Sequence, residues 1–276
     1  MCGIAGLLEV GRSSRDLAVV ASAMAHTIAH RGPDDADVWT DPAAGVALAH
    51  RRLSIVDLSQ AGHQPMRSHD GRLVMVYNGE LYNTSDVRAE LEGARGPIPW
   101  RGHSDTEVLL EGFVTWGVEA TLKRVVGMFA LAVWDRSERR LTLARDRLGE
   151  KPLYYGTFGS GARATLLFGS ELKALRVHPA FRGEIDRESL ALYARLGYVP
   201  GARSIYRGVH KLLPGTWIEF GPDRLQAEPR PYWSAWDIAL DGARNPSRAS
   251  EDDLAEELDT LLRLSLIHIS EPTRRS

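Results

Sequence analysis

Residues 1–10 read MCGIAGLLEV, and they contain the single cysteine of the 276-residue chain, Cys2. A thiol acts as a nucleophile only as the thiolate, and because a free cysteine has a pKa of about 8.5 it needs a nearby base. Removal of Met1 would supply that base, since a free α-amino group has a pKa of about 7.7–8.0. The position of Cys2 therefore predicts an N-terminal nucleophile, with a chance cysteine behind the start codon as the alternative.

The composition is that of an ordinary globular protein, with 43% hydrophobic and 25% charged residues. The formal net charge of -2 indicates neither a nucleic-acid-binding surface nor an acidic tail. One cysteine allows no internal disulfide, and no apolar run approaches the roughly 18 residues that span a bilayer. We therefore expect a cytoplasmic protein that binds neither nucleic acid nor membrane, and the nine histidines show no spacing that predicts a metal site.

Short apolar runs with β-forming residues dominate the first 170 residues, and several, such as MFALAVW (128–134), are apolar on both faces. The predicted strands are 3–10, 46–56, 73–77, 128–134, 140–144 and 165–168. Helical spacing predicts helices at 15–30, 104–122, 188–197 and 250–264. Capping boxes begin two of these helices, with Ser104 and Glu107 in one, and Ser250 and Asp253 in the other.

Seven motifs occur in a fixed order, and they read MCGIAG, HRGPD, RRLSIVD, YNGELYN, SDTEVLL, GMFALAVWD and RDRLGEKPLYY. Together they resemble the class II glutamine amidotransferases, specifically the glutaminase half of glutamine-hydrolysing asparagine synthetases, over residues 2–235. The resemblance implies an α+β fold, the four-layer α/β/β/α sandwich of two antiparallel sheets of N-terminal nucleophile hydrolases. It also implies that Cys2 attacks the side-chain amide of L-glutamine, releasing ammonia and leaving a thioester that water hydrolyses.

The resemblance assigns roles to the residues of a glutamine pocket. Arg52 would bind the α-carboxylate by a bidentate pair, and the α-ammonium would meet Glu80 and Asp105. Asn78 and Gly79 would donate to the oxyanion of the tetrahedral intermediate. The backbone that lines the pocket would be that of Leu53, Ser54, Ile55 and Val56.

Each of these roles has a structural alternative. Arg52 could be a surface arginine on a strand. Asp105 could be a helix-start acid that interacts with the helix dipole. An Asn-Gly pair is also typical of a hairpin turn, and we expect the turn at Asn78 and Gly79 to present the two donors.

The second half of an asparagine synthetase is an ATP-pyrophosphatase domain marked by an S-G-G-x-D-S loop, and no Ser-Gly-Gly occurs here. We therefore expect a truncated member that needs no cofactor or metal, whereas ATP and Mg²⁺ would belong to the missing synthetase domain. That domain and a second copy of the intact parent are the expected protein partners. The predicted divisions are a glutaminase domain (2–184), an inter-domain region (185–235), a linker with a first helix (236–264) and a foreign-looking tail (265–276).

Three alternatives stay open. The intact parent could amidate a carboxylate other than aspartate, because acceptor specificity would reside in the missing half. The chain could be an N-terminal nucleophile amidase for a different small amide. It could also be a non-catalytic fragment, which a retained Met1 would favour because the base would then be absent.

Overall fold

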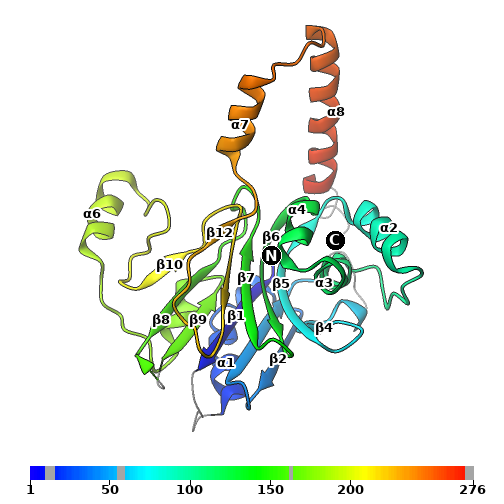
Figure 1. Ribbon diagram of the computed structural model, residues 1–276. Coiled ribbons are helices and arrows are strands. Elements are labelled where there is room, and N and C mark those ends of the chain that lie inside the picture. The colour runs from blue at the N-terminus through cyan, green and yellow to red at the C-terminus, as the bar shows by residue number, and fades with distance from the viewer. Residues whose placement is uncertain (10–15, 55–59, 162–163, 271–276) are drawn as a thin grey trace. The chain divides into compact units, whose positions relative to one another are not determined.

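The computed structural model describes residues 1–9, 16–54, 60–161 and 164–270, with side chains described as far as residue 263. The chain divides into two compact units, Met1–Trp233 and Ser234–Ser276. The first unit contains two six-stranded sheets, and every strand pairing in both is antiparallel. The sheets lie face to face, as Figure 1 shows.

The first sheet has β1 at its centre, because β1 pairs with β3 on one side and with β9 on the other. In spatial order its strands are β10 (Val209–Lys211), β8 (Tyr154–Phe158), β9 (Thr165–Gly169), β1 (Gly3–Glu9), β3 (Val46–Arg52) and β2 (Asp35–Asp41). The second sheet consists of β12 (Arg230–Pro231), β11 (Thr216–Phe220), β7 (Arg140–Arg145), β6 (Gly127–Asp135), β5 (Leu73–Leu81) and β4 (Met66–Arg67).

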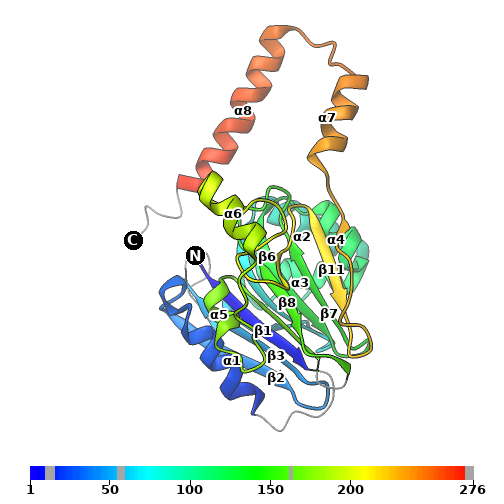
Figure 2. The ribbon, with the colours of Figure 1, turned by 90° about the vertical axis from the view of Figure 1, so that its left-hand side faces the viewer.

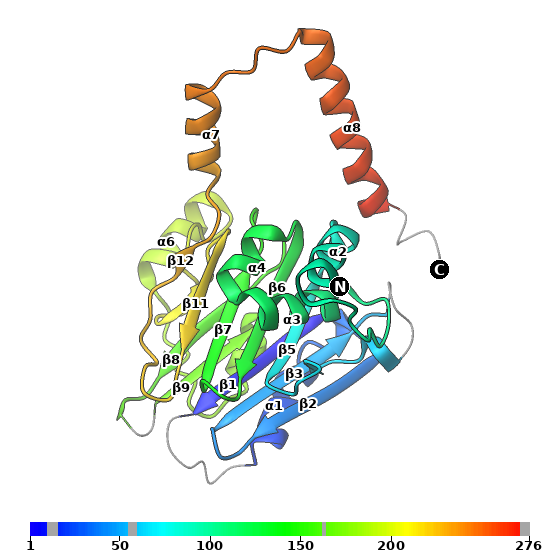
Figure 3. The ribbon, with the colours of Figure 1, turned by 45° about the vertical axis from the view of Figure 1, so that its right-hand side comes forward.

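Helices cover the outer face of each sheet. On the first sheet α1 (Leu17–His26) and α5 (Leu172–Arg176) pack against the outward side chains of β1, β3 and β9 (Figure 2). On the second sheet α2 (Thr84–Arg95), α3 (Asp105–Trp116) and α4 (Val118–Arg124) cover β5 and β6 (Figure 3). The predicted four-layer α/β/β/α sandwich is therefore confirmed.

Strand alternation separates the inner core from the two outer cores, because successive side chains of a strand point to opposite faces. Ile4, Leu8, Val46, Leu48, Val74 and Val76 lie in the core between the sheets. The intervening Ala5, Leu7, Ala47, Ala49, Met75 and Tyr77 face the helices. A residue of known parity on β1, β3 or β5 can therefore be assigned to a face.

The predicted helices are present with some changes. Residues 15–30 form α1 followed by a 3-10 turn (Ala29–Arg31), and Gly117, with φ of 78°, divides the helix predicted at 104–122 into α3 and α4. Further along, α6 is Arg187–Leu196, α7 is Ala235–Arg244 and α8 is Glu251–Ser270. Ser104 caps α3 by accepting from the Thr106 N–H, but the Glu107 carboxylate bonds elsewhere, so only the capping box of Ser250 and Asp253 is reciprocal.

Two expectations are wrong. Asn78 and Gly79 form no hairpin turn, since β5 runs on to Leu81 and pairs Gly79 with Phe129. Leu212 and Trp217, expected to await a second domain, are buried within the sandwich. Beyond residue 184, strands β10, β11 and β12 complete the two sheets. No helix within the described residues is long and apolar enough to cross a membrane.

Candidate active site

Cys2 immediately precedes β1 and lies on the inner side of the first sheet. Ile4 and Leu8 have the same parity and lie in the core between the sheets. The pairing of Gly3 with Arg51 directs Cys2 toward Arg52, the last residue of β3. The thiol is thus brought to one end of the space between the sheets, where β1 and β3 also approach β5 of the opposite sheet.

The backbone of Leu53 holds the thiol of Cys2. The Leu53 N–H donates to Sγ at 3.4 Å, and the thiol lies 3.7 Å from the Leu53 carbonyl oxygen as a donor. Ser54, next along the chain, donates its N–H to Asp34 Oδ2 at 2.8 Å. Two of the pocket residues predicted from the sequence therefore lie beside the nucleophile, whereas Ile55 and Val56 lie outside the described residues.

Burial raises the pKa of the Cys2 thiol, against the opposing effects of the Leu53 N–H, the terminal amine and Arg52, while Asp105 raises it further. Burial also lowers the pKa of the Met1 α-amino group. The two shifts disfavour an ion pair and favour a neutral thiol beside a neutral amine. In this state the sulfur needs a base that accepts its proton during attack.

Arg52 lies on the inner face, as expected for a pocket residue. Val46, Leu48, His50 and Arg52 share one parity on β3, and Arg52 is 8% exposed. Arg51 has the opposite parity, and its Nε donates to the Gly32 carbonyl oxygen at 3.0 Å. The structure therefore separates the two arginines in the manner that the sequence comparison of Arg51 and Arg52 predicts.

His50 connects the two sheets beside this arginine. Its Nε2 lies 3.0 Å from the Tyr77 carbonyl oxygen on β5, and since a carbonyl only accepts, Nε2 carries the proton. Complete burial lowers the pKa of His50 to about 4, so the ring is neutral near pH 7. Sequence reasoning assigned no role to His50, although its alternation with Arg52 could have placed it on the inner face.

Two hydrogen-bond donors lie on β5 at the same end of the sandwich. The Asn78 side chain is 1% exposed and shares the inner face with Val74 and Val76. Its Nδ2 is buried and has no hydrogen-bond partner within the described part of the chain. An amide NH₂ left without a partner costs free energy, typically about 1–3 kcal/mol, so it is a candidate donor to a bound group.

The Gly79 N–H points to the open edge of β5. Its partner Phe129 exchanges both backbone hydrogen bonds with Asp146, so Gly79 and Phe129 form a non-hydrogen-bonded pair. The N–H groups of Tyr77 and Leu81 point to the same edge, where Gln64 and Asp105 accept them at 2.6 and 2.9 Å. A Cβ on residue 79 would lie 2.4 Å from the Met128 carbonyl oxygen, so this position requires glycine.

Both acidic pocket residues border the same region. Asp105 begins α3, and its Oδ2 accepts from the Leu81 N–H and, at 3.2 Å, from the Tyr77 hydroxyl. Burial raises the pKa of Asp105 despite these hydrogen bonds. Glu80 follows Gly79 on β5, and its charge acts on Tyr77 and on the buried Lys151. Asp105 is thus both a helix-start acid and a group held at the site.

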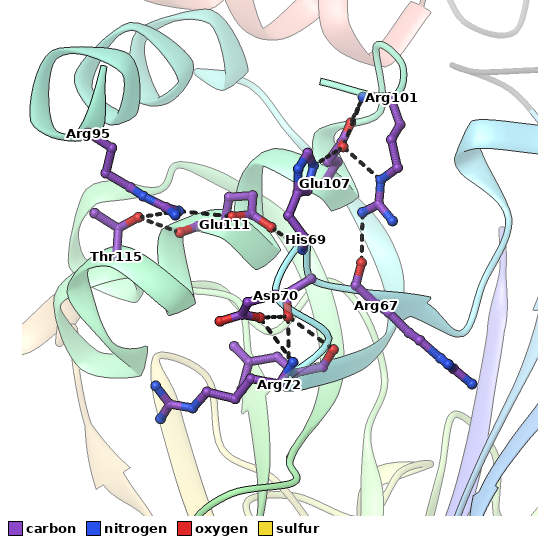
Figure 4. Close-up of polar contacts among 11 residues, drawn as sticks. Arg67, His69, Asp70, Arg72, Arg95, Arg101, Glu107, Glu111 and Thr115 are labelled. Atoms are coloured by element: carbon purple, nitrogen blue, oxygen red, sulfur yellow. Dashed lines mark hydrogen bonds and ion pairs between the residues drawn. The ribbon is translucent and has the colours of Figure 1, made fainter. Parts of the chain in front are cut away.

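A charged network fixes the beginning of α3 and hence Asp105 (Figure 4). Glu107 accepts from His69 Nε2 at 2.8 Å and from Nε and the backbone N–H of Arg101 at 3.0 Å each. One turn later, Glu111 accepts from the His69 N–H at 2.9 Å and from Arg95 at 3.0 Å. Both carboxylates have side chains only 1% exposed, so the loop before α3 is tied to the turn between β4 and β5.

The RDRLGEKPLYY motif organises a turn rather than supplying a ligand of its own. Asp146 is fully buried and accepts N–H groups of Leu148, Glu150 and Lys151 at 2.9–3.1 Å. Arg145 donates to the carbonyl oxygens of Lys151 and Leu212 at 2.8 and 2.7 Å. The turn places Lys151, whose pKa burial lowers, near Glu80 and the chain terminus. The described residues contain no cluster of metal-ligating side chains.

The fold is that of N-terminal nucleophile amidotransferases. Glutamine phosphoribosylpyrophosphate amidotransferase from B. subtilis superposes with a TM-score of 0.59 at 19% identity, covering 84% of this chain and 49% of that one. A second solved structure, an allosteric regulatory enzyme of purine biosynthesis, gives a TM-score of 0.61 at 19% identity. At this identity the likeness concerns the fold alone.

Residues 1–233 match the model of the glutamine amidotransferase domain, and the chain belongs to this family. Similar curated proteins are asparagine synthetase [glutamine-hydrolyzing] 3 of Bacillus subtilis (37% identical over 247 residues) and a putative asparagine synthetase of Mycobacterium bovis (38% over 237). These alignments cover 86% and 82% of this chain but 37% and 36% of the relatives. The chain thus spans little more than a third of the length of the relatives it matches.

Proposed function

We propose that this chain hydrolyses L-glutamine to glutamate and ammonia, with Cys2 as the nucleophile once Met1 is removed. The observation that carries the proposal is the convergence of a chain-terminal thiol, a buried unpartnered amide donor on Asn78 and the buried cation Arg52 at one end of the sandwich. Membership of the glutamine amidotransferase domain family supports the same reaction.

The residues then divide the work as follows. Arg52 and the backbone of Leu53 and Ser54 bind the α-carboxylate side of glutamine, while Asp105 and Glu80 bind the α-ammonium. Sγ attacks the amide carbon, its proton passes to the Cys2 amine, and the carbonyl oxygen becomes an oxyanion held by Asn78 Nδ2 and the Gly79 N–H. The amine gives that proton to the departing nitrogen, ammonia leaves, and a glutamyl thioester remains.

Water completes the cycle. The amine accepts a proton from the water that attacks the thioester, and the same two donors stabilise the second oxyanion. Collapse of that intermediate breaks the carbon–sulfur bond, releases glutamate and returns the proton to sulfur. Every step uses groups of this chain, glutamine and water.

The experiment is a glutaminase assay of the processed protein against Cys2→Ser. The serine hydroxyl is far less acidic than the thiol, so we expect glutamate formation to fall to background while the thermal unfolding midpoint changes little. Intact-mass measurement must first show that Met1 is absent. Wild-type turnover by Cys2→Ser, or hydrolysis by a chain that retains Met1, would contradict the mechanism.

We further propose that the domain supplies ammonia to an ATP-dependent synthetase region, with aspartate as acceptor. Its curated relatives named asparagine synthetases support this, whereas a different carboxylate acceptor remains the second candidate. ATP and Mg²⁺ would bind that other region. We expect no ATP–Mg²⁺ binding by this chain in isothermal titration, and no asparagine when ammonia is supplied directly; a clear isotherm or product would refute the division of labour.

A further inference from the structure

Arg31 contacts the backbone of the nucleophilic residue. Its Nε donates to the Cys2 carbonyl oxygen at 3.0 Å, and one terminal nitrogen donates to Glu171 Oε1 at 3.0 Å. The side chain is only 10% exposed. Arg31 lies in the HRGPD motif and ends the 3-10 turn after α1, and neither its motif nor the pocket described above gives it a role.

Glu171 fixes this arginine from the other side. It also accepts from His30 Nε2 at 2.9 Å and pairs with Lys173 Nζ at 3.1 Å. The preceding residue, Ser170, accepts the Ile4 N–H through its hydroxyl at 3.0 Å. The segment that follows β9 therefore anchors both β1 and the guanidinium that bonds to Cys2, so Arg31 is pre-organised before any substrate binds.

We propose that Arg31 is a positioning residue for the nucleophile: it fixes the backbone of Cys2, and its positive charge favours the neutral, proton-accepting form of the Cys2 amine. This inference rests on the proposed function. The carbonyl carbon that Arg31 holds through oxygen and the amine that processing exposes are attached to the same Cα. The cation therefore acts on the base at short range and in a partly buried site.

The other charged groups that face the terminus are Lys151, Asp34 and the thiol itself, with Arg52 and Asp105 acting on the sulfur. In the chain that still carries Met1, burial lowers the pKa of the terminal amine, and Arg31 and Lys151 lower it further against Cys2 and Asp34. Processing moves the amine one residue closer to Arg31. The effect of the guanidinium should then grow.

The test uses the fact that Cys2 is the single cysteine of the chain, so iodoacetamide labelling reports on this thiol alone. Labelling rate is measured against pH for processed wild type, Arg31→Gln, Arg31→Lys and Arg51→Gln. Loss of the cation should move the acid limb of the Arg31→Gln profile upward by about one pH unit. Arg31→Lys should retain most of the wild-type position, and Arg51→Gln, which holds the Gly32 carbonyl, should superimpose on wild type.

Glu171→Gln supplies a test of opposite sign that does not depend on the folding of Arg31→Gln. It leaves the guanidinium charge in place but removes the carboxylate that compensates it, so the acid limb should move downward by a few tenths of a pH unit. Superimposed profiles for wild type, Arg31→Gln and Glu171→Gln would overturn the inference. If wild type labels normally but hydrolyses no glutamine, the proposed function fails, while the labelling comparison still decides the role of Arg31.

Discussion

The glutamine pocket is assembled by residue parity on three strands. Cys2, Arg52 and Asn78 each occupy the inward position of their strand, and they meet because β1, β3 and β5 approach one another at one end of the sandwich. A shift of one residue in any strand would turn the side chain toward a helix. The residue-scale predictions therefore concern single atoms on this inner face.

Asn78→Ala removes the buried Nδ2 donor. If Nδ2 stabilises the oxyanion, kcat for glutamine should fall by about 10²–10³ with little change in KM, because the interaction exists only after attack. Asn83→Ala is the matched control, since that amide instead bonds to the backbone of Val126 and Arg124. It should lower stability without a comparable loss of kcat, and an unchanged kcat for Asn78→Ala would remove Asn78 from the mechanism.

Arg52→Lys keeps the positive charge but loses the planar pair of donors that fits a carboxylate. Loss of one charge-assisted hydrogen bond should raise the KM for glutamine by about tenfold. An amide substrate without an α-carboxylate should be affected much less, and Arg51→Lys should leave both KM values near wild type. Equal losses on the two substrates would indicate a structural role for Arg52.

Elements were predictable where the hydrophobic pattern is strong. The central strands β1, β3, β5, β6, β7 and β9 and the helices α1, α3, α6 and α8 coincide with predicted segments to within a few residues or a break at Gly117. Strands β10 and β12 are too short to show periodicity, and β2, with its acidic residues, is half-exposed. The Asn-Gly pair was misleading because turn propensity yields to pairing with β6.

The candidate site could be predicted only through its motifs. Strand parity places Arg52 and Asn78, but the pairing of β1 with β3 and the approach of β5 involve residues far apart in the chain. Arg31 and His50 were overlooked for the same reason. Their partners, Glu171 and the Tyr77 carbonyl, lie 140 and 27 residues away, and no local pattern reports such contacts.

The beginning of α3 depends on the Glu107 carboxylate. Although burial acts to raise it, the hydrogen bonds from His69 and Arg101 hold the pKa of Glu107 below its ordinary value. Glu107→Gln puts an amide donor against those donors and should lower the free energy of unfolding by about 2 kcal/mol. Urea denaturation measures this, with the exposed Glu119→Gln as a control that leaves the midpoint unchanged; equal midpoints would show that the network is dispensable.

His50 makes the link between β3 and β5 sensitive to acid. Its folded pKa of about 4 lies below the unfolded value of 6.5, so between these values the unfolded chain binds the extra proton. Stability should therefore fall as pH drops from 6.5 toward 4, by up to about 3 kcal/mol from this residue. His50→Gln should remove that part of the slope in unfolding experiments across this range, whereas the exposed His26→Gln should retain it.

At the scale of the whole molecule, the first unit ends at Trp233. Ile218 and Phe220 on β11 help to close the core between the sheets, and the hydroxyl of the buried Tyr232 donates to the Arg145 carbonyl oxygen at 2.9 Å. We propose that residues 1–233 form the folding unit of the glutaminase domain, in place of a boundary near residue 184.

A chain ending at residue 233 should therefore keep the glutaminase kcat and the main unfolding midpoint of the full chain. A chain ending at residue 184 would lose β10, β11 and β12 and expose the inner core, so it should fail to fold cooperatively. Calorimetry and the glutaminase assay on both chains decide between the boundaries. A cooperative, active chain of 184 residues would restore the shorter domain.

Because β1 starts directly behind Cys2, the protein has no spare residues at its catalytic end. Under the proposed mechanism, a purification tag fused there would leave the sandwich folded and soluble-looking on any column, yet every tagged molecule would be silent. Activity in a preparation would then count correctly trimmed chain ends rather than folded protein. The fraction of mature mass in a spectrum would be the active-site concentration, and an aminopeptidase of the host would in effect be the activating enzyme.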